Sequence, residues 1–380
     1  MEIPKTPEPT GDKRYDLTTP FLLNAGGTRL IELQPTLRCN LRCAHCYSES
    51  DPDRRGELPL SSLTGFLESA ADLGYGYVGV SGGEPLLWSH LEDFLDFARS
   101  TGFSTSITTN ATLLTPKRAA ALHGRADLVA VSVDGPPADH AAIRGSDWAF
   151  PAMQRGLAAL REEGIPFTLA FTLTRFNADR LSWLYRFADS EGASGINVHP
   201  LCNFGAASSN LSDAIPDGQE FQAASWLLAL LVQGHDNGGP SVTLDAMRRS
   251  VIEQSRWPLL AEDEHHLRRA GFSDLVPSLV VEPDGCIVPF IYGFPRKWRV
   301  GYLDYDPLIT ASKTWIENCV GPVAHLIQST LERLASQGAD YIDLFGEVLA
   351  SAHKSNDTGG NEAASSGEND RGASARQVSV

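Results

Sequence analysis

The chain has 380 residues, 42% of them hydrophobic and 21% charged, and its formal net charge is −16. This acidic balance disfavours nucleic acid and anionic membranes as partners, because both are bound by basic surfaces. No apolar run approaches the roughly 20 residues that span a bilayer, and the N-terminus lacks the apolar core of a signal peptide. We therefore expect a cytoplasmic protein that binds neither nucleic acid nor a membrane.

Residues 26–205 alternate short apolar runs with longer amphipathic stretches, and Gly or polar clusters separate most of them. This order predicts six βα units, and therefore an α/β fold with a parallel sheet and outer helices. Six units are too few for an eight-stranded barrel but fit a partial (β/α)6 TIM-like barrel. The predicted strands are 29–34, 77–80, 104–108, 128–133, 167–173 and 196–199, and the predicted helices are 61–73, 89–100, 116–122, 150–163 and 178–190.

The rest of the chain is less regular. Residues 1–25 are polar and Pro-rich, which indicates an irregular lead-in. Residues 206–352 are expected to form a mixed, mainly helical extension, and residues 353–380 a disordered tail that is rich in Gly, Ser, Asn and Glu. Within the extension, Pro283-Asp284-Gly285 predicts a β-hairpin. The predicted elements of the extension are helices at 221–232 and 246–254, hairpin strands at 279–282 and 286–289, and helix across 314–351 with a break at 321–322.

Three of the six cysteines lie within eight residues, at Cys39, Cys43 and Cys46. In a cytosolic chain, such spacing indicates metal binding or redox chemistry rather than disulfides. Three thiolates are one fewer than an ordinary iron–sulfur cube or structural zinc site uses, so a cube held here would keep one iron open. Zinc with His45 as fourth ligand is an alternative, weakened because adjacent residues rarely point at one ion. Unliganded core cysteines are a third reading, but the segment around them is polar.

Polar residues follow the next predicted strands at their carboxyl ends, where sites form in parallel sheets. Val80-Ser81-Gly82-Gly83-Glu84-Pro85 brings two glycines, which allow close backbone approach, and a carboxylate. Asn110 ends the third strand, and Ser132 and Asp134 end the fourth. Each signal alone also fits a turn or a helix cap. Four consecutive strands that end in ligand-type residues together predict a binding site on one rim.

Cys-x3-Cys-x2-Cys followed by Gly-Gly-Glu-Pro resembles the radical S-adenosylmethionine (SAM) enzyme superfamily, over residues 28–200. The resemblance implies one [4Fe–4S] cluster on Cys39, Cys43 and Cys46, with SAM on the open iron. It implies reductive cleavage of SAM to a 5′-deoxyadenosyl radical that removes a substrate hydrogen, with an external one-electron donor such as flavodoxin or ferredoxin. Ile143-Arg144-Gly145 also resembles the family but suggests no role for Arg144. The SAM contacts that the resemblance implies are His45, Tyr47, Gly82, Gly83, Glu84, Pro85, Asn110, Ser132 and Asp134.

The segment 281–290 resembles the hairpin of SPASM and twitch extensions, which carry an auxiliary cluster. Here the usual ligand positions hold Leu279 and Phe290, which cannot bind iron. We therefore expect a degenerate extension that caps the barrel without a second cluster. The remaining cysteines, Cys202, Cys286 and Cys319, are far apart, and buried cysteine is more often a small hydrophobic residue than a ligand or hydrogen donor.

Peptide maturation in a ribosomal natural-product pathway is the first hypothesis for the function, because the hairpin resembles that of peptide-modifying enzymes. Only about 25 residues precede the barrel, so we expect no separate leader-binding domain there. The same chemistry on a small natural-product intermediate, such as a sugar nucleotide or amino acid, is the alternative, by decarboxylation, epimerisation or dehydrogenation. A non-catalytic metal-binding protein is a distant third, which the paired motifs oppose.

Overall fold

The computed structural model describes residues 29–234, 239–261 and 267–357. The predicted lead-in at 1–25 lies outside these residues. The strands are β1 (Arg29–Leu33), β2 (Tyr75–Val80), β3 (Ser104–Thr109), β4 (Leu128–Ser132), β5 (Phe167–Leu173), β6 (Gly195–Pro200), β7 (Ser241–Leu244), β8 (Met247–Arg248), β9 (Ser278–Val281), β10 (Cys286–Pro289), β11 (Gly301–Tyr302) and β12 (Tyr341–Ile342).

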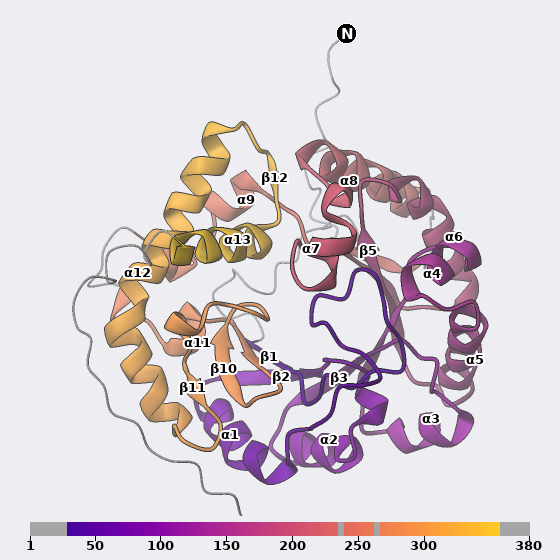
Figure 1. The fold of residues 1–380 in the computed structure, drawn as a ribbon, viewed down its shortest axis with the longest axis horizontal. Coiled ribbons are helices and arrows are strands. Elements are labelled where there is room, and N and C mark those ends of the chain that lie inside the picture. The colour runs from indigo at the N-terminus through magenta and orange to yellow at the C-terminus, as the bar shows by residue number, and fades with distance from the viewer. Residues whose placement is uncertain (1–28, 235–238, 262–266, 358–380) are drawn as a thin grey trace, which may run out of the picture.

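Ten of these strands form one sheet, in the order β11-β10-β9-β1-β2-β3-β4-β5-β6-β7. Strands β1 to β7 each run parallel to the next, and β9 runs parallel to β1 on its other side. Strands β10 and β11 complete the sheet in antiparallel pairs. The sheet bends into an open barrel with helices around its outside (Figure 1). The predicted α/β fold, a partial TIM-like barrel with a mainly helical extension, is confirmed.

The helices surround this sheet and extend beyond it. The α-helices are α1 (Leu60–Asp72), α2 (Leu91–Ser100), α3 (Pro116–Leu122), α4 (Pro137–Arg144), α5 (Ala149–Glu162), α6 (Leu181–Glu191), α7 (Ala206–Asn210), α8 (Gly218–Gln233), α9 (Arg249–Glu253), α11 (Phe272–Leu275), α12 (Leu308–Ser336) and α13 (Leu344–Asp357). The 3-10 turns are η2 (Pro85–Leu87), η3 (Ala178–Arg180), η4 (Ser212–Ala214), η5 (Pro258–Leu260) and η6 (Arg296–Trp298). No described helix is both long and apolar enough to cross a membrane.

The two faces of the barrel strands differ in polarity, as alternation along a strand requires. In β1, Ile31 and Leu33 are fully buried in the main hydrophobic core. Glu32 and Gln34 share the opposite face, since the Gln34 amide bonds the Glu32 carboxylate. The barrel interior at β1 is therefore polar, while the face toward the helices is apolar.

The C-terminal part of the chain departs from prediction in four places. Helix α12 continues through Pro322, so the predicted break there is wrong: Pro322 is exposed, while Val323 and Ile327 are buried and hold the helix on the core. The first residues of the helix predicted at 246–254 form strand β8 instead, because they pair with β12. Strand β7, which was not predicted, adds a seventh parallel strand to the barrel sheet. The predicted tail begins too early, because α13 extends to Asp357.

Candidate active site

The cysteine loop follows β1 at its carboxyl end, as expected from the sequence. Cys39 is 8% exposed, while Cys43 and Cys46 are half-buried. Burial, and after it the negative charges of nearby Glu84, Cys43 and Cys46, raise the pKa of Cys39 to about 12. The three thiols thus lie within electrostatic reach of one another.

Hydrogen bonds from distant segments hold the cysteine loop in place. Ala44 donates its N–H to the carbonyl of Ile143 at 2.8 Å and accepts from the Asn210 side chain at 3.2 Å. The Ala206 N–H bonds the carbonyl of Cys46 at 2.9 Å. Residues from α4 and α7 therefore fix the loop on both sides, although they follow it by about a hundred residues or more.

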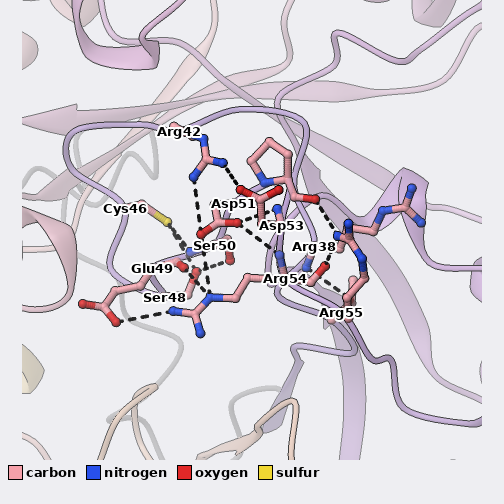
Figure 2. A network of polar contacts seen from close by, with 12 residues as sticks. Arg38, Arg42, Cys46, Ser48, Glu49, Ser50, Asp51, Asp53, Arg54 and Arg55 are labelled. Carbon is pink, nitrogen blue, oxygen red and sulfur yellow. Dashed lines mark hydrogen bonds and ion pairs between the residues drawn. The ribbon is translucent and has the colours of Figure 1, made fainter.

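A polar network closes the loop back on itself (Figure 2). Arg42 pairs with Asp51 at 3.5 Å and also with Asp53. The N–H of Asp53, followed by that of Arg54, lowers the pKa of Asp51. At the same turn the Ser50 N–H lies 3.3 Å from the Cys46 sulfur and donates to it. This hydrogen bond joins the Cys46 sulfur to the turn that follows it.

The Gly82–Gly83 turn lies directly against the cysteine loop. The Gly83 N–H donates to the Thr36 carbonyl at 2.8 Å, and the Glu84 N–H to the Arg38 carbonyl at 2.9 Å. A Cβ atom on Gly83 would lie 2.3 Å from that Arg38 oxygen, and Gly82 has a φ of +102°. Only glycine allows both the conformation and the approach, so the two motifs form one continuous backbone surface.

Glu84 is directed into the protein. Its side chain is fully buried and accepts hydrogen bonds from the Thr109 hydroxyl (2.6 Å), the Asn110 N–H (3.0 Å) and the Leu86 N–H (3.2 Å). Burial raises its pKa, and these bonds oppose the rise. Pro85 opens the short helix η2 behind it. Glu84 therefore fixes the end of β3, and one of its carboxylate lone pairs stays without a described partner.

Asn110 and Ser132 lie on the predicted rim. The Asn110 amide bonds Asn40 at 3.0 Å and lies 3.9 Å from the Cys39 sulfur, so it joins the cysteine loop. Ser132 ends β4 half-buried. Both residues are where the sequence placed them.

Asp134 is the centre of a buried charge cluster that the sequence did not predict. It bonds Arg144 at 2.5 Å and His45 Nε2 at 2.9 Å, and its side chain is 1% exposed. Burial alone would raise the pKa of Asp134, but Arg144, then His45, and the more distant His140 hold it well below its usual range. Arg144 also donates to the Cys43 sulfur at 3.6 Å. Arg144, which the sequence left without a role, thus links Asp134 to the cysteine loop.

The described residues contain no group of three or more His, Cys, Asp or Glu side chains that could hold one metal ion. His45 bonds Asp134 through Nε2, and it does not join the three cysteines in a group that could hold one metal ion. An iron–sulfur cube differs from a zinc site, because each cysteine binds a different iron and the sulfurs need not meet at one point.

Tyr47 points from the cysteine loop into the barrel interior. Its hydroxyl bonds Gln34 at 3.1 Å and Ser81 at 3.3 Å, and its ring meets Tyr292 edge-on at 5.4 Å. Sequence reasoning did not select the interior residues Glu32 and Gln34. The signal was present, since both are polar and flank Leu33 at the end of a strand that also contains Leu30 and Ile31.

The extension contributes one wall of a cavity of about 660 Å3 beside the cysteine loop. Tyr47, Phe204 and Tyr292 give it an aromatic lining, and Glu282 and Arg296 form an ion pair in its wall. Leu279 and Phe290, where the resemblance to SPASM and twitch extensions would place cluster ligands, are buried in the hydrophobic core. Cys286 is likewise fully buried, whereas Cys202 and Cys319 are half-buried.

Comparisons with known proteins agree with this geometry. The family profile described as "Radical SAM superfamily" matches residues 33–188. A pre-heme d1 synthase from Dinoroseobacter shibae is 28% identical over 80% of this chain and 77% of its own length. A PqqA peptide cyclase from Streptomyces rochei is 33% identical over 51% of this chain and 54% of its own length. For several curated relatives, the chain spans only about half of the relative's length.

Among solved structures, Streptococcus suis SuiB bound to S-adenosylmethionine aligns with a TM-score of 0.59 at 16% identity, covering 79% of this chain and 68% of SuiB. At that identity the likeness concerns the fold. The family profile places residues 33–188 in the radical SAM superfamily, whose enzymes use a [4Fe–4S] cluster and SAM, and the joined cysteine and Gly-Gly-Glu loops agree with that match.

Proposed function

We propose that this chain is a radical SAM enzyme that acts on a peptide during maturation of a ribosomal natural product. Cys39, Cys43 and Cys46 would hold the one [4Fe–4S] cluster. The observation that carries the proposal is the contact of the Gly82–Gly83 turn with the cysteine loop, which joins a three-thiol site to a bare backbone surface. That surface suits a ligand that must approach both the thiols and the backbone.

The residues around the three thiols fit a cluster with net negative charge. Arg144 donates to the Cys43 sulfur, the Ser50 N–H donates to the Cys46 sulfur, and Asn110 lies beside Cys39. Hydrogen bonds and charges of this kind set the reduction potential of iron–sulfur clusters. When bound, the cluster and SAM supply one-electron cleavage of a sulfonium to methionine and a 5′-deoxyadenosyl radical.

The proposed SAM pocket contains residues with two kinds of role. Gly82, Gly83, Asn110 and Ser132 lie on the rim and would contact SAM directly. Glu84 would offer its remaining lone pair to an amino group while it holds Thr109 and Asn110 in place. The pocket would be shaped by His45, which Asp134 holds in place, and by Tyr47 and Pro85.

A peptide substrate is supported by the similarity to the PqqA peptide cyclase. The cavity beside the cysteine loop also fits, because it is open and offers Tyr47, Phe204 and Tyr292 to a side chain. A small-molecule substrate is the second candidate, and similarity to the pre-heme d1 synthase over 80% of the chain favours a tetrapyrrole. In either case, electrons would come from an external donor such as flavodoxin or ferredoxin in the cytoplasm.

Anaerobic reconstitution tests the proposal. The wild type should bind about four iron and four sulfide per chain and, with dithionite and SAM, form 5′-deoxyadenosine. Cys43→Ala should form none, whereas the matched control Cys319→Ala should retain both iron and activity, because Cys319 lies in α12. Equal activity of Cys43→Ala would refute the cluster assignment, and about eight iron per chain would refute the single cluster.

A further inference from the structure

We infer that Arg144, held by Asp134, is the positioning residue that sets the reduction potential of the cluster through its contact with the Cys43 sulfur. Asp134 then acts through Arg144 and not as a direct contact of SAM. The role rests on the proposed function, because it concerns the cluster that the three clustered cysteines would hold. It also gives a purpose to the Ile143-Arg144-Gly145 motif, which the sequence left without one.

The end of helix α4 is docked on the cysteine loop. The Ile143 carbonyl, near the end of that helix, accepts the Ala44 N–H at 2.8 Å. Gly145 ends the helix in the left-handed conformation, with a φ of +67°, and a Cβ atom there would lie 3.2 Å from the Arg42 carbonyl. Glycine suits both the conformation and the close approach. The backbone on each side of Arg144 therefore contacts the loop, and its side chain starts from a fixed point.

The Arg144 side chain is also fixed at its far end. The residue is 8% exposed, and its Nε donates to Asp134 Oδ2 at 2.5 Å while its Nη1 donates to the Cys43 sulfur at 3.6 Å. The other Asp134 oxygen bonds His45 Nε2 at 2.9 Å, and the Asp134 side chain is only 1% exposed. Both carboxylate oxygens thus have partners within the protein, so Asp134 orients Arg144 and His45.

The other sulfurs of the loop have neutral neighbours. The Cys46 sulfur accepts from the Ser50 N–H at 3.3 Å, and the Asn110 amide lies 3.9 Å from the Cys39 sulfur. Of the donors that reach the three sulfurs within the described part of the chain, only the Arg144 guanidinium carries a charge. One side chain therefore places a full positive charge against one ligand of the cluster.

A positive charge beside a ligand sulfur favours the reduced cluster. Reduction adds one electron, so a cation in contact stabilises the reduced state more than the oxidised state. Arg144 should therefore raise the potential and keep the cluster within reach of the external one-electron donor. The Asp134 carboxylate should oppose this with a smaller effect, because it lies behind the guanidinium.

An EPR-monitored redox titration of the reconstituted protein without SAM tests the inference. Arg144→Gln should shift the equilibrium toward the oxidised cluster roughly tenfold, which is 59 mV for one electron. Arg144→Lys keeps the charge and should shift it much less, while Asp134→Asn should shift it in the opposite direction. The matched control is Arg99→Gln, because Arg99 also pairs with an aspartate, Asp127, but at the amino-terminal end of the strands. Its potential should equal that of the wild type.

The affinity for SAM distinguishes this role from a direct contact with SAM. Equilibrium dialysis with the oxidised protein should give Arg144→Gln a Kd for SAM close to that of the wild type. If Arg144 bound SAM directly, loss of a charged hydrogen bond would weaken binding roughly tenfold or more. Weaker binding with an unchanged potential overturns the inference.

Iron and sulfide contents and thermal melting accompany each titration, so that only folded and loaded proteins are compared. An unchanged potential in Arg144→Gln, or an equal fall in Arg144→Lys, also overturns the inference. If Arg144→Gln does not fold or load, Asp134→Asn decides: a raised potential supports the role of the pair, and a potential that does not rise overturns it. A wild type that binds the cluster but forms no 5′-deoxyadenosine refutes the proposed function, whereas the potentials still report on Arg144.

Discussion

Asp134 shows at the scale of one residue how a buried charge can organise a site. Its carboxylate is almost fully buried, and Arg144 both compensates it and reaches the Cys43 sulfur. Removing one member of a buried ion pair leaves the other charge without compensation. Arg144 is therefore expected to contribute to stability and to the environment of the thiol at once.

We predict that Arg144→Met lowers the free energy of unfolding by about 3–5 kcal/mol, because Asp134 stays buried without its strongest partner. Adding Asp134→Asn should restore part of the loss, since the uncompensated charge is then gone. Urea denaturation of both single variants and the double variant measures this coupling. Strictly additive losses would show that the two side chains do not depend on each other.

Helix α12 illustrates what decides structure at the scale of an element. Its 29 residues continue past Pro322, which cannot donate a backbone hydrogen bond and disfavours a helix by about 3 kcal/mol. Val320, Val323 and Ile327 are fully buried. Burial of this face outweighs the local preference of proline, which is why a break predicted from Gly321-Pro322 alone was wrong.

We predict that Pro322→Ala stabilises the protein by about 1–3 kcal/mol, because it restores a backbone donor at an exposed position and removes no packing. Glu332→Ala, also exposed on α12, should change stability by less than about 0.5 kcal/mol. Urea denaturation compares the two. A destabilised Pro322→Ala would mean that the ring has contacts or a bend on which the helix depends.

At the scale of the whole molecule, the extension is joined to the barrel rather than attached beside it. Strand β9 pairs with β1, so the hairpin is part of the same sheet as the barrel. Asp343, from the loop before α13, has its pKa raised to about 7 from 3.8 by burial and then by Asp245. A titrating group thus lies where barrel and extension meet.

The raised pKa of Asp343 gives stability a defined pH dependence. Between about pH 4 and 7 the folded state holds this proton more tightly than the unfolded state, so stability falls as pH rises through that range. Asp343→Asn keeps a helix-capping side chain without the titration. Between pH 5 and 7.5, the free energy of unfolding of this variant should fall by up to about 2.5 kcal/mol less than that of the wild type. Urea denaturation at both pH values checks this, with the exposed Asp304→Asn as control, and equal losses would contradict it.

The sequence by itself determined the βα order and the two motifs, because each depends on residues close together in the chain. Cys39, Cys43 and Cys46 have a readable spacing, and Gly82–Gly83 marks a turn. Periodicity likewise predicted the six barrel strands within a few residues. Strand β7 was missed because its four residues are too few to show a clear period.

Only the tertiary structure decided which side chains meet. Arg144 reaches Cys43 across 101 residues, and Asn210 bonds the Ala44 carbonyl across 166. Such contacts leave no local pattern in a single sequence. They arise because parallel strands place their carboxyl ends on one rim, and because the extension returns to that rim through β9 and α13.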